Sequence, residues 1–203
     1  MNFIESGRQR IVEYTHLIYY AYVMKHIAVF CSAYDLDEKY TKPACEFASL
    51  MPKNKYDLVW GGSDTGLMNL VASAVQNNGG KLIGISLEAY RAKARQNADE
   101  MIIAKTLGER KATMLERADA IIVLVGGIGT LDEATEIIEL KKQKHHNKPI
   151  VILNTENFYE GLKVQLQKMK DDGFIPLPLD DLIYFADKPS EAIEYINIKL
   201  QEG

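Results

Sequence analysis

From residue 25 onward, short apolar runs alternate with longer stretches in which apolar residues recur at helical spacing. The runs at 120–125 and 150–153 are apolar at successive positions, which is typical of strands buried on both faces of a parallel sheet. The pattern therefore predicts an α/β fold over residues 25–203, with a doubly wound, Rossmann-like parallel sheet and helices on both faces. Expected strands occupy 27–31, 56–60, 81–86, 100–104, 120–125, 149–154 and 182–186. Expected helices occupy 39–50, 66–77, 110–117, 131–144, 158–170 and 189–200, with a weaker helical pattern at 88–98.

Residues 1–24 lie outside this alternation and are expected to form an N-terminal appendage. Their apolar run, 14–24, is interrupted by Thr15 and His16 and is too short to span a bilayer as a helix. No small-residue cleavage site of a signal peptide precedes Lys25. Two interpretations stay open: an upstream extension with Met24 as the natural start, or an amphipathic helix packed on the domain or on a partner.

Composition narrows the class of protein. The 203 residues are 47% hydrophobic and 26% charged, which is ordinary for a globular chain. With 24 Lys+Arg against 28 Asp+Glu, the net charge of −4 offers no basic footprint for nucleic acid. Two cysteines are too few for a disulfide framework, and the adjacent His145 and His146 point apart on a helix, so no metal site is expected. We expect a cytoplasmic protein with no membrane and no nucleic-acid partner.

Two glycine-rich turns follow expected strands, GGSDTG at 61–66 and GGIGT at 126–130. Glycine allows backbone N–H groups to approach an anion, and the next helix adds its positive end, so a phosphate fits such a turn. Neither turn matches the P-loop or the dinucleotide fingerprint. Tight packing of strand on helix is the structural alternative for each turn, but two turns at one sheet edge favour phosphate binding.

The second turn also brings a carboxylate. Thr130 and Glu133 have the spacing of a capping box, in which Glu133 stabilises the start of a helix. A carboxylate one turn into a helix whose start binds phosphate also lies where a ribose would sit. Both interpretations of Glu133 stay open at this point.

The segment RKATMLERADAIIVLVGGIGTLDE, residues 110–133, resembles the signature of the LONELY GUY (LOG) family of cytokinin riboside 5′-monophosphate phosphoribohydrolases. The family pattern is R-K followed by P-G-G-x-G-T-x-x-E, with the arginine and the glutamate catalytic. Arg110 and Glu133 fall on those two positions, so the resemblance implies that they are the catalytic residues. It extends from about residue 26 to the C-terminus, through segments such as Phe30-Cys31-Ser32 and Gly66-Leu67-Met68.

The resemblance also implies further substrate contacts. The residues expected to bind substrate or its phosphate are Ser32, Gly62, Lys111, Gly126, Gly127, Ile128, Gly129 and Thr130. Glu88 and Glu139 are weaker candidates for a contact with the base, and an exposed surface position is the alternative for Lys111. Implied with these residues are a small nucleotide substrate, no cofactor and a homodimer. Family members are often misnamed lysine decarboxylases, but no S-x-H-K segment for a pyridoxal phosphate lysine occurs here.

The chemistry follows from charge. Hydrolysis of the N-glycosidic bond of a nucleoside 5′-monophosphate passes through an oxocarbenium-like state, which a carboxylate such as Glu133 stabilises. Arg110 stays protonated and suits an anion contact or the leaving base. Val125, Ser63 and Asn69 replace a proline and two glycines of the family pattern. The preferred base, adenine or an N6-modified adenine, stays open, and a non-catalytic nucleotide- or cofactor-binding protein is the competing hypothesis.

Overall fold

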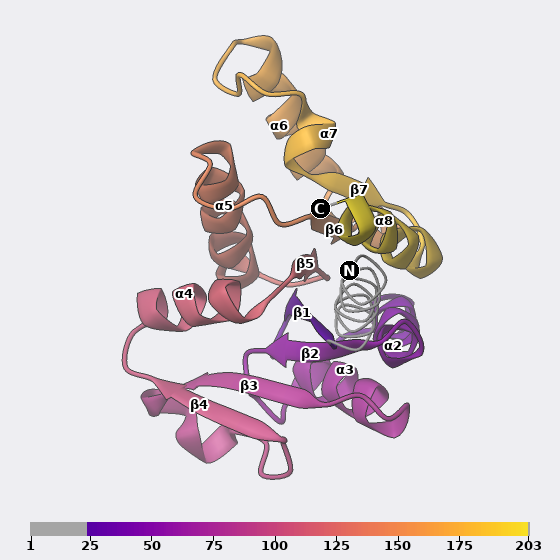
Figure 1. Cartoon of the computed structure of the whole chain (residues 1–203), viewed down its shortest axis with the longest axis vertical. Helices are drawn as coiled ribbons and strands as arrows, with labels where there is room; N and C mark the ends of the chain where they lie inside the picture. Colours follow the sequence, from indigo (N-terminus) through magenta and orange to yellow (C-terminus); the bar gives the residue numbers. More distant parts are fainter. Residues whose placement is uncertain (1–23, 203) are drawn as a thin grey trace, which may run out of the picture.

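A computed structural model describes residues 24–202 of the chain. Its centre is a seven-stranded sheet in the order β4-β3-β2-β1-β5-β6-β7, with every neighbouring pair parallel (Figure 1). The predicted Rossmann-like α/β fold is confirmed. The strands are β1 (Lys25–Phe30), β2 (Tyr56–Trp60), β3 (Leu82–Leu87), β4 (Glu100–Ala104), β5 (Ala120–Val123), β6 (Ile150–Leu153) and β7 (Tyr184–Ala186).

Helices cover both faces of this sheet (Figure 1). The α-helices are α2 (Glu38–Lys53), α3 (Gly66–Asn77), α4 (Leu107–Arg117), α5 (Ile128–Lys142), α6 (Glu160–Asp171), α7 (Leu179–Leu182) and α8 (Pro189–Glu202). Two 3₁₀ helices are η1 (Glu88–Lys93) and η2 (Thr155–Asn157). No helix within residues 24–202 is long and apolar enough to cross a membrane.

The sheet separates two hydrophobic cores. One contains residues of α2, α3 and α8, and the other contains residues of α4, α5, α6 and α7. Within β5, Ala120 and Ile122 face the first core, whereas Ile121 and Val123 face the second. This double burial explains why the central strands are apolar at successive positions rather than alternating with polar residues.

The order of the strands places a topological switch between β1 and β5. The chain runs outward from β1 to β4, then returns to β5 beside β1 and continues outward to β7. The register pairs Val29 of β1 with both Trp60 of β2 and Ile122 of β5, so these strands end at the same level. In such sheets, ligands bind beyond the carboxyl ends of the strands where the connections diverge.

Two expected elements differ from the structure. The helical pattern at 88–98 forms only the short η1, because Ala94 pairs with Ser63 in an isolated antiparallel bridge. The helix expected from residue 131 already begins at Ile128, on the glycine turn itself. The appendage expected over residues 1–24 lies outside the described residues, apart from Met24 at its end.

Candidate active site

A cavity of about 600 Å³ opens at the switch point, beyond the carboxyl ends of β1, β2, β3 and β5. Its walls come from the loops that follow these four strands and from the starts of α4 and α5. A hydrogen bond of 3.1 Å from the backbone N–H of Ser32 to the carbonyl of Val125 joins two of those loops. Residues of both glycine turns, 61–66 and 126–130, line this one cavity, as their positions after strands predict.

Arg110 and Glu133 form a buried ion pair in this cavity. Arg110 lies one turn into α4 and Glu133 lies in α5, and they are only 8% and 7% exposed. The Nη1 of Arg110 donates to Oε1 of Glu133, and its Nε donates to the carbonyl of Ile85 at 2.9 Å. The guanidinium is thus anchored to the end of β3, and it brings together the two residues that the sequence predicts to be catalytic.

Burial decides the electrostatics of Glu133. Loss of solvent raises the pKa of its carboxyl above the usual value, and the charge and hydrogen bond of Arg110 oppose this rise without cancelling it. Asp132 adds to the rise, and Lys111 opposes it. A carboxylate that is poorly solvated and held by a fixed cation is preorganised to stabilise positive charge and to accept a proton.

The start of α5 offers backbone donors to the same cavity. The helix begins after Gly127 with no side-chain cap and no acidic residue in its first turn. A Cβ at Gly127 or Gly129 would meet no atom within 4 Å, so the space above these residues is open. Ile128 between them is 82% exposed. Free N–H groups and the positive end of a helix, with no side chain in front of them, form a site for phosphate.

The capping-box interpretation of Thr130 and Glu133 is wrong. Thr130 is buried inside α5, because the helix starts two residues before it, and its side chain packs onto the backbone of Gly126. A Cβ at Gly126 would lie 2.1 Å from the Oγ1 of Thr130. Glu133 consequently turns to Arg110 and does not cap its own helix.

A related side-chain cap does occur at α4, where the carboxylate of Glu109 bonds one residue before the N-cap Thr106. Thr106 accepts from the N–H of Glu109 at 3.1 Å, and the carboxylate of Glu109 accepts from the N–H of Lys105 at 2.8 Å. Together these bonds fix the start of the helix that carries Arg110.

The other expected contacts divide into two groups. Ser32, Lys111, Ile128 and the glycines 127 and 129 line the cavity with Thr130. The side chain of Lys111 is only 11% exposed, and its ammonium pairs with both Glu136 and Asp132, the latter at 2.9 Å. The hydrogen bonds of Glu136 and then of Asp132 raise the pKa of Lys111. It therefore borders the cavity as a paired cation, which matches neither a free phosphate contact nor an exposed surface lysine.

Four expected residues do not line the cavity. Gly62 has a φ of +73° and turns the loop behind the wall, and Gly126 makes room for Thr130. Glu88 is exposed and pairs with Arg91 of η1. Glu139 is exposed and pairs with Lys142 on the outer face of α5.

Sequence reasoning missed most of the rim of the cavity. The large side chains of Tyr34, Tyr90, Leu107 and Ile128 line its mouth, and all four are exposed. Of these only Ile128 was expected, as part of the second glycine turn, and no motif in the sequence marks Tyr34, Tyr90 or Leu107 as site residues. Gly61 was also missed as a determinant: a Cβ there would lie 2.1 Å from Nη2 of Arg110, so only glycine leaves room for the guanidinium.

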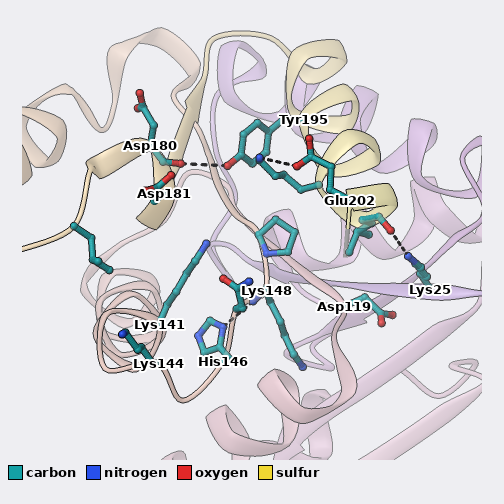
Figure 2. Close-up of a pocket in the computed structure, with 15 residues that line it drawn as sticks. Lys25, Asp119, Lys141, Lys144, His146, Lys148, Asp180, Asp181, Tyr195 and Glu202 are labelled. Atoms are coloured by element: carbon teal, nitrogen blue, oxygen red, sulfur yellow. Dashed lines mark hydrogen bonds and ion pairs between the residues drawn. The ribbon is translucent and has the colours of Figure 1, made fainter.

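A larger cavity, about 1120 Å³, lies at the opposite edge of the sheet, where the strands begin (Figure 2). Figure 2 shows Lys141 pointing into it from α5, among further lysines and the acids Asp119, Asp180, Asp181 and Glu202. None of the predicted site residues lines it. Ligands of parallel sheets bind at the carboxyl edge, so the smaller cavity at the switch point is the candidate active site.

Comparison with known proteins identifies the family of the chain. A family described as "Possible lysine decarboxylase" matches residues 68–196. A cytokinin riboside 5′-monophosphate phosphoribohydrolase of Mycobacterium tuberculosis is 33% identical over 169 residues, which cover 82% of this chain and 90% of that protein. The probable cytokinin riboside 5′-monophosphate phosphoribohydrolase LOGL9 of Oryza sativa subsp. japonica is 37% identical over 155 residues, covering 75% of this chain and 68% of that protein.

Among solved structures, the molybdenum cofactor binding protein from Rippkaea orientalis aligns with a TM-score of 0.70. It is 20% identical and covers 88% of this chain and 99% of its own, so this likeness shows the fold alone. The curated relatives define an N-glycosidase of the phosphoribohydrolase class. The chain belongs to the LONELY GUY family.

The buried ion pair predicts that replacing Arg110 lowers the free energy of unfolding by an amount that depends on pH. Arg110→Met leaves the Glu133 carboxylate buried without its partner, so we expect unfolding to become easier by about 3–5 kcal/mol near neutral pH. Removing Arg110 raises the pKa of Glu133 further above its unfolded value. Such an acid contributes stability below its unfolded pKa and loses it as pH rises through the folded pKa, so the deficit should shrink from about pH 8 to about pH 5.

Urea unfolding at both pH values measures this deficit. As the matched control, Arg110→Met combined with Glu133→Leu removes both charges and should regain most of the lost stability. A deficit of equal size at the two pH values would show that the buried carboxylate is not its source.

Proposed function

We propose that this enzyme hydrolyses the N-glycosidic bond of a purine nucleoside 5′-monophosphate, with adenine or an N6-modified adenine as the base. The products are the free base and ribose 5-phosphate. The observation that carries the proposal is the position of the buried Arg110–Glu133 pair beside the uncapped, glycine-rich start of α5 in one cavity. The relatives named as cytokinin riboside 5′-monophosphate phosphoribohydrolases support the same substrate class.

In the proposed mechanism, the charge of each group determines its role in the reaction. The 5′-phosphate binds the N–H groups at Gly127–Gly129, which orients the ribose toward Glu133. The C1′–N bond breaks with its electron pair going to the base, and the carboxylate of Glu133 stabilises the positive charge at C1′ and O4′. Water adds its oxygen to C1′ and gives one proton to Glu133, whose raised pKa suits a general base. The departing nucleobase takes one proton from bulk water, and Glu133 returns its proton to bulk water, so the net reaction consumes one water molecule.

Arg110 stays protonated throughout and holds Glu133 in place between turnovers. A non-catalytic nucleotide carrier with this fold is the competing hypothesis. A carrier would need the phosphate site but not a buried acid, so the role of Glu133 distinguishes the two hypotheses. Incubation with AMP and with isopentenyladenosine monophosphate, followed by detection of free base and ribose 5-phosphate, tests the reaction directly. We also place the reaction in the cytoplasm, where free thiols such as Cys31 and Cys45 stay reduced.

Glu133→Gln should abolish most turnover in a folded protein. The amide keeps the shape of the side chain but loses the charge that the oxocarbenium-like state requires, so we expect kcat to fall by at least about 100-fold. Glu139→Gln is the matched control, because Glu139 lies on the same helix outside the cavity and should leave kcat unchanged. Near-normal turnover of Glu133→Gln would favour the carrier hypothesis.

The phosphate of the substrate should be essential. Because the start of α5 offers only backbone donors to an anion, a nucleoside without its 5′-phosphate loses charge-assisted bonds. We expect kcat/KM for adenosine to lie on the order of 100- to 1000-fold below that for AMP. Comparable hydrolysis of the two compounds would place the phosphate elsewhere.

We further propose that the working unit is a homodimer whose second copy covers the rim. Ala134, Ile137 and Ile138 of α5 are buried within one chain, so the apolar stripe of this helix belongs to the core and is not available as an interface. The exposed rim residues such as Tyr34 and Ile128 lie around the cavity mouth, where a partner would bury them and exclude water.

Light scattering should therefore give a mass near twice the 22.9 kDa of the chain. Dilution below the dissociation constant of the dimer should lower the specific activity together with the mass. A 22.9 kDa species with full specific activity would disprove the dimer without touching the proposed reaction.

A further inference from the structure

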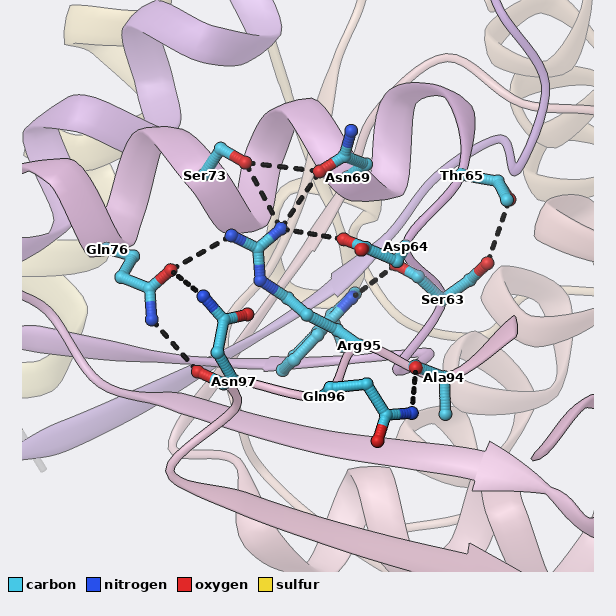
Figure 3. Close-up of polar contacts among 11 residues, drawn as sticks. Ser63, Asp64, Thr65, Asn69, Ser73, Gln76, Ala94, Arg95, Gln96 and Asn97 are labelled. Atoms are coloured by element: carbon cyan, nitrogen blue, oxygen red, sulfur yellow. Dashed lines mark hydrogen bonds and ion pairs between the residues drawn. The ribbon is translucent and has the colours of Figure 1, made fainter. Parts of the chain in front are cut away.

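A buried arginine lies behind one wall of the candidate active site. Arg95 is 8% exposed, and its guanidinium donates to four acceptors (Figure 3). Nη1 donates to Asp64 at 2.9 Å, to Asn69 at 2.9 Å and to Ser73 at 3.1 Å. Nη2 donates to Gln76 at 2.9 Å. Three of these acceptors lie along one face of α3, and Asp64 belongs to the glycine turn that precedes it.

Backbone bonds tie the same two segments together. The N–H of Arg95 donates to the carbonyl of Gly62, and the N–H of Asp64 donates to the carbonyl of Lys93, both at 2.9 Å. Ser63 and Ala94 form the antiparallel bridge between these two bonds. The end of η1 is thereby held against the turn at 61–66.

Both segments form part of the cavity wall. Tyr90 and Lys93 line the cavity from η1, and Gly61, Ser63 and Thr65 line it from the glycine turn. Arg95 does not line the cavity, and neither it nor its partners bonds to Arg110 or Glu133. It can therefore affect substrate only through the position of this wall.

Stability alone does not account for Arg95. Its one carboxylate partner, Asp64, has a half-exposed side chain, and its Nε is a buried nitrogen without a hydrogen-bond partner among residues 24–202. A buried guanidinium with incomplete pairing gains little free energy, and apolar replacement of such groups is often neutral. What the planar, five-donor group does provide is fixed geometry between two elements. Asn69, which departs from the family pattern, supplies one of the four acceptors that bind the guanidinium of Arg95.

We propose that Arg95 is a positioning residue that fixes the wall formed by η1 and the glycine turn, and so determines which bases the cavity accepts. This inference rests on the proposed function for its substrate. The ribose and phosphate bind on the opposite side, at Glu133 and α5, so the wall faces the remaining part of the nucleotide, the base.

Arg95→Met tests the proposal, because methionine fills most of the volume and removes all four donated bonds. The sole tryptophan, Trp60, reports on the wall without any substrate: it is fully buried, and its Nε1 donates to the carbonyl of Ser63 at 3.3 Å. We expect Trp60 emission to change in Arg95→Met. Asn69→Ala, which removes one acceptor only, should show a smaller change and serves if Arg95→Met fails to fold.

The kinetic test compares AMP, isopentenyladenosine monophosphate and the product ribose 5-phosphate. For Arg95→Met we expect KM to rise at least about tenfold with kcat within about threefold, and the ratio of kcat/KM between the two nucleotides to fall toward one. Inhibition by ribose 5-phosphate, which lacks the base, should stay within about twofold of the wild type. Arg117→Met, which breaks an ion pair with Glu100 away from the cavity, should change none of these values.

The outcomes separate the two proposals. A change in Trp60 emission in a chain that hydrolyses no nucleotide supports the fixed wall and refutes the reaction. An active Arg95→Met enzyme with unchanged emission, KM and base preference overturns the role of Arg95 and leaves the reaction intact. If ribose 5-phosphate binding weakened as much as nucleotide binding in Arg95→Met, the role of Arg95 in base selection would also be overturned. The substitution would then have changed the sugar-phosphate site as well as the wall that faces the base.

Discussion

Two opposite charges held out of water at the switch point of the sheet are the constraint on which the candidate site depends. Neither Arg110 nor Glu133 is stable in that position alone, so each requires the other. The pair in turn requires a carbonyl at the end of β3 and a position without a side chain at Gly61. Four elements distant in sequence are therefore fixed by one interaction, whose carboxylate is the group that we propose to be catalytic.

The fold could be predicted from sequence because burial on both faces leaves a simple signal. Successive apolar residues in β5 and β6 indicate a parallel sheet, and the glycine turns mark the edge where its ligands bind. The predicted catalytic pair could be located because its two residues lie on a segment of 24 residues with a family signature. Their direct contact could not, since α4 and α5 meet only in three dimensions.

The capping box expected at Thr130 and Glu133 was wrong for a physical reason. Thr130 and Glu133 satisfy the local spacing, but the turn before them lacks side chains and lets the helix start earlier, at Ile128. The conformation of η1 and the residues after it escaped prediction for a different reason: it depends on bonds from Arg95 to residues about 20 to 30 positions away. Local pattern describes the regular elements well and describes segments held by long-range polar bonds poorly.

The phosphate site proposed at α5 would use main-chain N–H groups, and this has an evolutionary consequence. Main-chain donors persist through substitution as long as the backbone keeps its path, so the anchor for a phosphorylated sugar would be inherited almost unchanged. Side chains such as Tyr90 and Lys93, by contrast, can be replaced without disturbing that anchor. Substitutions at a few wall positions could therefore change the base specificity of such an enzyme. The main-chain site for the sugar phosphate would be retained through those changes.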